Sequence, residues 1–381
     1  MAIGIWPVLC IQQTMRYFLF ILISLVLCLS CNIRNVINPP TAREKYERNY
    51  KGPDSLLKSW QLAYSHALQQ PTTIDLPLAM TIKIPDTTVT ALGYSMVVNN
   101  GQVLVVELDR HTDSLAFFVE IYERKKNNPG EYNMLEAITG TGTILQTAIA
   151  TTDTVIVLVQ PVIHNRSLFR LRIYPQPAYL FPVAGKGNAA ISSFWGAARD
   201  GGGRSHEGID IMAARGTPLL AVADGRITST GNRGLGGKQV WLRDAIYKRS
   251  VYYAHLDSII AQDGQQVKKG DTVGLVGNTG NAITTAPHLH FGIYGSGGAM
   301  DPHLFVKKLP IPAFSDTLLT QKVITRNNKN ELKAGPAAKF TTIHTLPKND
   351  TLTIVGKTQN WYYVKRGNEE GFILQSAVNT Y

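Results

Sequence analysis

A cluster of histidines in short strand-like segments, between Ser205 and Phe291, constrains the fold of this chain more than any other feature. Four of the nine histidines fall in this window, and one of them precedes an aspartate by four residues. Imidazoles grouped with a carboxylate are a typical pattern of metal ligands. The window therefore predicts strands that bring together His206, Asp210, His255, His288 and His290.

The segment that carries His206 and Asp210 is expected to be extended. Gly208 and the β-branched Ile209 both disfavour a helix. Because side chains alternate between the two faces of a strand, His206, Gly208 and Asp210 would point to one side. Glu207 would then point away from the site.

Two further segments follow the same rule of alternation. His288 and His290 would share one face of a strand, with Leu289 and Phe291 turned into a core. In the other segment, Val251, Tyr253 and His255 would share a face. Three short strands would thus place four imidazoles and one carboxylate in one region.

His206-Glu207 also resembles the start of a helical His-Glu-x-x-His zinc motif, in which the glutamate is the general base. Here the fifth position is Asp210, and the intervening Gly208-Ile209 argues against a helix. We therefore do not expect Glu207 to act as the base.

The ordered set His-x-x-x-Asp, Ala-His and His-x-His resembles the lysostaphin/LytM-type zinc metallopeptidases of peptidase family M23. The resemblance covers roughly residues 179–306. It implies zinc (Zn2+) as the cofactor, and no residue of the set is missing, unlike in the inactive relatives that serve as activators. Four glycine-containing turns match the family in order: 216–218, 223–225, 267–271 and 277–280. The implied zinc ligands are His206, Asp210 and His290, and the implied catalytic histidines are His255 and His288.

The chemistry of such a set is consistent with this resemblance. Three nitrogen and oxygen ligands leave zinc a fourth position for water, as in catalytic sites. A bound zinc ion lowers the pKa of that water and polarises a peptide carbonyl. A neutral histidine accepts a proton, and a protonated one stabilises an oxyanion or serves the leaving amine. The division of these roles between His255 and His288 stays open. Scattered surface or core histidines are the alternative, and we assign that ordinary role to His66, His111, His164, His303 and His344.

The N-terminal part of the chain predicts export. Residues 15–31 place a basic residue before an apolar run that is too short for a comfortable transmembrane helix, which is the form of a secretory signal. Ser30-Cys31 resembles a bacterial lipoprotein cleavage site, with Cys31 as the lipid attachment residue, although Cys28 replaces the usual leucine. An uncleaved membrane anchor is the alternative. The expected location is the bacterial cell envelope, as a membrane-anchored lipoprotein that faces the periplasm.

Charge and cysteine usage agree with export. The net charge of +11 suggests an anionic partner. No recognised nucleic-acid motif accompanies the charge, so we expect no nucleic-acid partner and favour an acidic cell envelope. A solvated basic surface without a partner is the alternative. All three cysteines precede residue 32, so the rest of the chain has no disulfide and depends on packing for stability.

We expect a mainly β protein in five parts. The 381 residues leave room for two or three domains. Asp54 is expected to cap a short helix that runs through Gln69. Regular short strands separated by turn residues suggest a β-sandwich-like domain. The expected parts are a signal (1–31), a tether and short helix (32–73), the β-sandwich-like domain (74–176), an antiparallel β zinc metallopeptidase domain (177–312) and a small SH3-like β-barrel (313–381).

The C-terminal part resembles a bacterial SH3-like domain. The matching segments include Ala334-Gly335-Pro336, residues 360–364 and residues 370–373, although Lys333-Ala334 replaces the usual Arg-Ser. The resemblance implies that this domain holds the peptide part of peptidoglycan and so tethers the protein to the wall. A purely scaffolding role is the alternative.

Two glycine-rich segments lie within the predicted metallopeptidase domain. Residues 199–204 are expected to be flexible and to shape the rim of a groove. Residues 231–237 are not interpreted as a phosphate-binding loop, because no Lys-Ser/Thr pair follows them and no helical pattern succeeds them.

The sequence as a whole predicts an exported zinc endopeptidase that cuts peptide cross-links or bridges of bacterial peptidoglycan, with the peptidoglycan peptide as substrate and a lipid anchor in the membrane. One alternative is a non-catalytic envelope regulator that binds and activates another wall hydrolase. The other alternative is a peptidase that acts on protein substrates.

Overall fold

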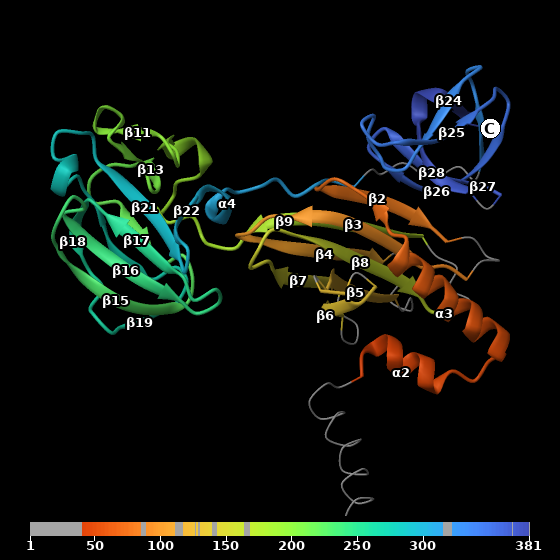
Figure 1. The fold of residues 1–381 in the computed structure, drawn as a ribbon, viewed down its shortest axis with the longest axis horizontal. Coiled ribbons are helices and arrows are strands. Elements are labelled where there is room, and N and C mark those ends of the chain that lie inside the picture. Colours follow the sequence, from red (N-terminus) through yellow and green to blue (C-terminus); the bar gives the residue numbers. More distant parts are fainter. Residues whose placement is uncertain are drawn as a thin grey trace, which may run out of the picture.

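The computed structural model describes residues 40–84, 89–110, 117–125, 127–128, 130–138, 143–163, 168–314, 322–367 and 369–380. The fold is mainly β, as predicted (Figure 1). The predicted signal and its Cys31 lie outside the described residues, as do His111 and His164. Among the helices of the described ranges, none has the length and apolar character needed to cross a bilayer.

Within the described residues, two helices precede the first sheets. Helix α2 (Ala42–Asn49) begins with a capping box, in which Thr41 Oγ1 accepts a hydrogen bond from the Glu44 amide and the Glu44 carboxylate accepts one from the Thr41 amide. Tyr46 packs against Trp60 and Phe118. The prediction of a tether is therefore wrong for residues 42–49, because capping and aromatic packing stabilise a helix there.

Helix α3 (Asp54–Gln69) has the predicted bounds. However, Pro53 holds the N-cap position and no side chain caps this end, so the prediction of Asp54 as the cap was wrong. Asp54 lies in the first turn instead, where a negative charge interacts favourably with the helix dipole.

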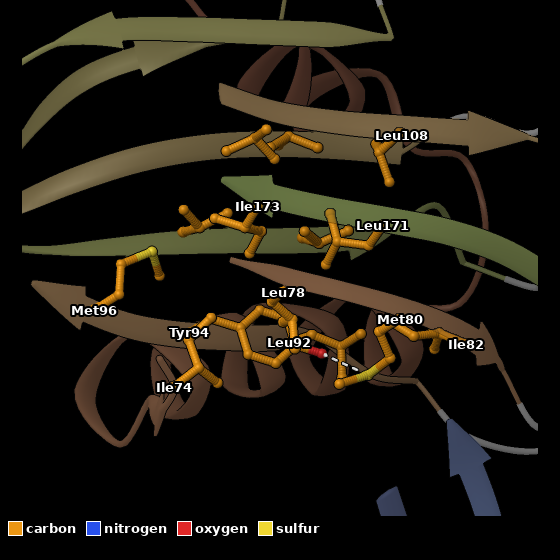
Figure 2. Close-up of a cluster of buried hydrophobic side chains, with 14 of the residues drawn as sticks. Ile74, Leu78, Met80, Ile82, Leu92, Tyr94, Met96, Leu108, Leu171 and Ile173 are labelled. Carbon is orange, nitrogen blue, oxygen red and sulfur yellow. Dashed lines mark hydrogen bonds between the residues drawn. The ribbon is translucent and has the colours of Figure 1, made fainter. Parts of the chain in front are cut away.

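Two facing sheets form the predicted sandwich. One has the strand order β1-β3-β8-β5-β6, and β2, β9, β4 and β7 follow one another in the second. Their buried side chains form one core, and Figure 2 shows Leu171 and Ile173 of β9 beside Tyr94 and Met96 of β3. The strands are β1 (Thr72–Thr73), β2 (Leu78–Lys83), β3 (Leu92–Val98), β4 (Gln102–Arg110), β5 (Phe117–Arg124), β6 (Tyr132–Ala137), β7 (Ile144–Ala148), β8 (Asp153–Pro161) and β9 (Leu168–Pro177).

The central region, drawn from green to cyan-blue in Figure 1, has a second core and its own antiparallel sheet. The sheet order is β10-β13-β21-β17-β16-β15-β19, with β22 paired to β21, and β14-β20-β18 form a separate small sheet. The strands of the large sheet are β10 (Ile191–Ser193), β13 (Ile209–Met212), β15 (Gly225–Asn232), β16 (Lys238–Asp244), β17 (Ser250–Ala254), β19 (Gln266–Val267), β21 (His288–Gly295) and β22 (Gly298–Met300). The remaining elements are the 3-10 helices η1 (Asn188–Ala190), η2 (Asp200–Gly202) and η3 (Gly280–Ala282), the strands β11 (Ala198–Arg199), β12 (Arg204–Ser205), β14 (Pro218–Leu220), β18 (Leu256–Ile259) and β20 (Thr272–Val276), and helix α4 (His303–Val306).

The sandwich and the central region meet at a small buried contact. Arg249 donates hydrogen bonds to Asn100 Oδ1 and to the Ala150 carbonyl. Gly101 has φ +87°, and a Cβ atom there would lie 2.7 Å from the ring of Phe305 in α4. Glycine is therefore needed at this position both for the backbone conformation and for the close approach.

The C-terminal region continues the sheet of the sandwich. Strand β26 pairs with β2 through Thr81 opposite Lys357 and Ile82 opposite Gly356. Figure 1 shows this blue region against β2. The elements are β23 (Lys322–Thr325), β24 (Asn330–Lys333), β25 (Thr342–Leu346), β26 (Thr351–Thr358), β27 (Trp361–Arg366), β28 (Glu369–Leu374), η4 (Gln375–Ala377) and β29 (Val378–Thr380). Four side chains of this region are buried in the core of the sandwich: Val355, Trp361, Tyr363 and Phe372.

This shared core predicts that the two regions stabilise each other. We expect Phe372→Ala to cost about 3–5 kcal/mol, because it removes a fully buried aromatic side chain. Hydrogen exchange of the β2 and β9 amides should become faster in this variant. Leu352→Ala is the control, since Leu352 belongs to a separate core within the C-terminal region. Unchanged exchange in β2 and β9 of Phe372→Ala would contradict the shared core.

Candidate metal centre

Strands β13 and β21 carry three of the predicted site residues. They pair antiparallel, with Asp210 opposite His290 and Met212 opposite His288. Leu289 and Phe291 are fully buried in the core of the central region. The predicted alternation along residues 288–291 is therefore confirmed, and both histidines of β21 face away from that core.

His206 lies before the strand rather than within it. Strand β13 begins at Ile209, so the prediction of a strand that includes His206 was wrong. The His206 amide donates to the Ala197 carbonyl instead, and its own carbonyl accepts from Gly196. His206 therefore belongs to the hairpin that precedes β13. A Cβ atom at Gly208 would lie 2.6 Å from the Phe291 carbonyl oxygen, so the chain passes close to β21 there.

Three donor atoms converge despite this local difference. Asp210 Oδ1 lies 3.0 Å from His206 Nε2 and 3.1 Å from His290 Nδ1, and the two nitrogens lie 3.0 Å apart. Among the described residues, these are the histidine, cysteine and acidic side chains that group closely enough to hold a metal ion. Two imidazoles and one carboxylate are a ligand set of catalytic zinc sites. The residues present therefore fit a zinc ion.

The protonation of these groups also suits a cation. Burial raises the pKa of the Asp210 carboxyl, but its close contacts with the His206 and His290 imidazoles outweigh this and hold the pKa well below its usual range. Burial lowers the pKa of His290, although Asp210 opposes the shift. A charged carboxylate and a neutral imidazole are the forms that ligate metals.

Three of the histidines are anchored in the same way. The Nδ1 atom lies 2.9 Å from the Phe194 carbonyl in His206, 2.9 Å from the Thr279 carbonyl in His255, and 2.8 Å from the Ala286 carbonyl in His288. A carbonyl oxygen only accepts, so each Nδ1 carries the proton that it donates. Each Nε2 atom is then left as an acceptor or ligand.

His255 reaches the site through an unusual backbone conformation. Strand β17 ends at Ala254, and His255 has φ +64°, in the left-handed region. The predicted shared face with Val251 and Tyr253 was therefore wrong. Those two side chains are fully buried in the core, whereas the left-handed residue redirects the imidazole toward β21. The His255 ring centroid lies 5.1 Å from that of His288 and 5.9 Å from that of His290.

The environment of His255 keeps its imidazole neutral. Burial, aided by the neighbouring His288, lowers the pKa of His255 to about 4. Its amide donates a 2.8 Å hydrogen bond to the Gly236 carbonyl, which fixes the left-handed turn to the loop 231–237. At neutral pH the Nε2 lone pair of His255 is therefore available.

The four histidines and the aspartate of the site line a cleft of about 410 Å³. The hairpin β11–β12, the loop that carries Leu235 and the 3-10 helix η3 that carries Ala282 also contribute to the lining. Residues 199–204 form parts of two short strands and a 3-10 helix, and Arg199 and Arg204 line the cleft, so the prediction that this segment shapes the groove is confirmed. Glu207 is exposed and contributes to the lining of this cleft, contrary to the expectation that it points away from the site, and it lies outside the three-residue donor group.

Sequence reasoning missed two contacts of the site. Arg199 donates a hydrogen bond to Asp210 Oδ2 and forms an ion pair with it. Tyr252 stacks on Trp241, with ring centroids 4.3 Å apart, and approaches His290 edge-on. An arginine eleven residues before the aspartate has no recognisable spacing, whereas strand alternation does place Tyr252 on the face opposite Tyr253.

Comparison with known proteins assigns two parts of the chain. Residues 204–302 match the family model described as peptidase family M23, and residues 331–379 match the bacterial SH3 domain. An L-Ala--D-Glu endopeptidase of Bacillus subtilis is 34% identical over 140 residues, which cover 33% of this chain and 43% of the relative. The murein hydrolase activator NlpD of Salmonella typhimurium is 34% identical over 130 residues, or 34% of this chain and 31% of the relative.

A solved structure gives a similar match. The catalytic domain of lysostaphin from Staphylococcus simulans is 32% identical, with 30% of this chain and 89% of that domain covered and a TM-score of 0.28. The alignments span less than half the length of the curated relatives named above. The chain therefore contains a peptidase family M23 domain in its central region and a bacterial SH3 domain in its C-terminal region.

Proposed function

We propose that this protein is a zinc-dependent endopeptidase that hydrolyses peptide cross-links or bridges of bacterial peptidoglycan. The observation that carries the proposal is the convergence of His206, Asp210 and His290 beside two further histidines in one cleft. An endopeptidase among the similar proteins, named for a bond between L-alanine and D-glutamate, supports the choice of substrate.

In this proposal His206, Asp210 and His290 hold the metal. A bound zinc ion lowers the pKa of a water molecule and polarises the carbonyl of the peptide bond. His290 is held by β21 and Asp210 by the neighbouring β13, so two of the three ligands lie on paired strands. Their positions are then fixed by the sheet rather than by the metal alone.

His255 and His288 transfer protons. Each presents Nε2 as an acceptor, because the proton of Nδ1 is engaged by a backbone carbonyl. One imidazole takes a proton from the attacking water, and a protonated imidazole delivers one to the leaving amine. The arrangement does not divide these two tasks between the residues.

The rival function is a non-catalytic envelope regulator that activates another wall hydrolase. It is supported by the similarity to the activator NlpD. The presence of all five metal-site and catalytic candidates favours the enzyme. The other alternative is a peptidase that acts on protein substrates. Comparing the digestion of casein with that of purified peptidoglycan separates it from our proposal.

The deciding experiment measures metal content and muropeptide release together, on the chain from Asn32 with purified peptidoglycan. We expect about one zinc per chain, as in mononuclear catalytic sites, and new products whose release a chelator blocks. Zinc without products would favour the regulator. A chain without zinc would contradict the proposal.

The SH3 domain is proposed to act mainly as a scaffold. Trp361, Tyr363 and Phe372 are buried against the sandwich, so this aromatic face is not available for a wall peptide. Lys339 also forms an ion pair with Asp75 beside β2. These contacts favour the scaffolding alternative over wall tethering for this face of the domain.

We also propose export and lipid attachment at Cys31, which places the enzyme in the bacterial cell envelope with a membrane anchor. Cys31→Ala should abolish labelling by a radioactive fatty acid, because the acylated thiol is lost. Cys28→Ala is the matched control and should keep the label. The alternative, an uncleaved anchor, would be favoured if the wild type took up no fatty acid and the Cys31→Ala variant stayed in the membrane with its N-terminal segment uncleaved.

A further inference from the structure

The two carboxylate oxygens of Asp210 have different partners. Oδ1 lies 3.0 Å from His206 Nε2 and 3.1 Å from His290 Nδ1, whereas Oδ2 accepts a hydrogen bond from Arg199 Nη2. We propose that Arg199 is a positioning residue, which occupies Oδ2 so that Asp210 presents Oδ1 alone to the metal. The inference rests on the metal site of the proposed function.

The hairpin β11–β12 holds Arg199 in place. Arg199 pairs with Arg204 across the hairpin, and hydrogen bonds between residues 196–197 and His206 extend the same ladder. The segment that carries Arg199 is therefore also the segment that carries a proposed ligand. A change in the hairpin would move both side chains together.

The same guanidinium nitrogen makes a second contact. Arg199 Nη2 donates a 2.9 Å hydrogen bond to Ser193 Oγ, and Ser193 lies opposite Asp210 in the pairing of β10 with β13. The side chain of Asp210 is 13% exposed and that of Arg199 is 32% exposed. The ion pair is thus largely shielded, and the planar guanidinium restricts rotation of the carboxylate.

Charge alone argues for the opposite effect. A guanidinium beside a divalent cation repels it, and it also competes with the cation for the carboxylate. Removal of Arg199 would then strengthen zinc binding. A positioning role predicts weaker binding instead, since partners that orient a ligand typically contribute a factor of about 10 to 100 in metal affinity. The two roles therefore differ in the sign of the change.

The test is a zinc titration of the purified full chain in detergent, in competition with a fluorescent chelator. We expect Arg199→Ala to lower zinc affinity by about 10- to 100-fold. Arg199→Lys should show a smaller loss, because it keeps the charge but not the planar fork of donors. Arg243→Ala is the control, since it removes the same charge from an exposed position of β16 outside the cleft, and it should not weaken zinc binding.

Cobalt(II) provides a readout that a merely structural role would not alter. Its visible absorption depends on ligand number and geometry, so the spectrum of Arg199→Ala should differ from that of the wild type, while that of Arg243→Ala should not. Equal or tighter zinc binding by Arg199→Ala would overturn the inference alone. A wild-type chain that binds no zinc would overturn the proposed function and this inference together.

Discussion

Replacing His290 with alanine is expected to empty the metal site and to abolish peptidoglycan hydrolysis. His290 Nδ1 lies within 3.1 Å of both the Asp210 carboxylate and His206 Nε2, so its loss removes one of three converging donors. Two donors seldom retain zinc, because catalytic sites use three protein ligands. Metal analysis after dialysis should therefore find the zinc content reduced from about one per chain to a trace.

Folding of the variant is checked separately. Leu289 and Phe291 supply the buried side of β21, and His290→Ala leaves both in place. We expect the variant to show the same circular dichroism as wild type treated with a chelator. Glu207→Gln is the matched control for a polar side chain in the same cleft, and it should retain zinc. Full zinc content in His290→Ala would remove this residue from the ligand set.

The part of the site that sequence predicted correctly depends on local geometry. Alternation along a strand is a property of the backbone, so the spacing of His288 and His290 was sufficient to place both on one face. The burial of Leu289 and Phe291 on the other face fixes the register, because a shift by one residue would expose them. The alternation along β21 therefore places Leu289 and Phe291 in the core and, at the same time, His288 and His290 in the site.

The part that sequence could not predict depends on contacts between distant segments. The left-handed conformation of His255 is held by the Gly236 and Thr279 carbonyls, which come from two different loops. The contact of Arg199 with Asp210 requires the hairpin to fold back over β13. Neither contact has a fixed spacing along the chain. Strand alternation assumes an extended backbone, and His255 has a left-handed one, so alternation predicted the wrong face for its side chain.

In the fold as well, most features set by local sequence were predicted and features set by distant contacts were not. The sandwich strands alternate locally and were predicted, whereas the pairing of β2 with β26 joins the two regions through residues far apart in sequence. Helix α2 was missed because its residues are mostly charged and polar, and its stability comes from the Thr41 cap and from the contact of Tyr46 with Trp60. The strand pairing has no local indication, whereas the Thr41-x-x-Glu44 capping box and the helix formers that follow it are local signals of α2 that the expectation of a tether did not use.

Replacing His255 should separate catalysis from metal binding. We expect the variant to retain zinc, because His255 is not part of the converging donor group. Turnover should fall by about 10²- to 10⁴-fold, which is the usual contribution of a positioned proton-transfer group. Muropeptide release and metal content, measured on the same preparation, test both expectations.

The choice of substitution matters at this position. Alanine is strained at φ +64°, so His255→Ala combines loss of the imidazole with a backbone cost. Asparagine tolerates the left-handed region, and His255→Asn therefore removes the imidazole with less disturbance of the turn. Both variants should keep zinc and lose turnover. His303→Ala is the control for a histidine outside the donor group, which packs against Phe194, and it should leave turnover near that of wild type. If His255→Asn emptied the site while remaining folded, His255 would be a ligand, and the roles proposed for the four histidines would have to be reassigned.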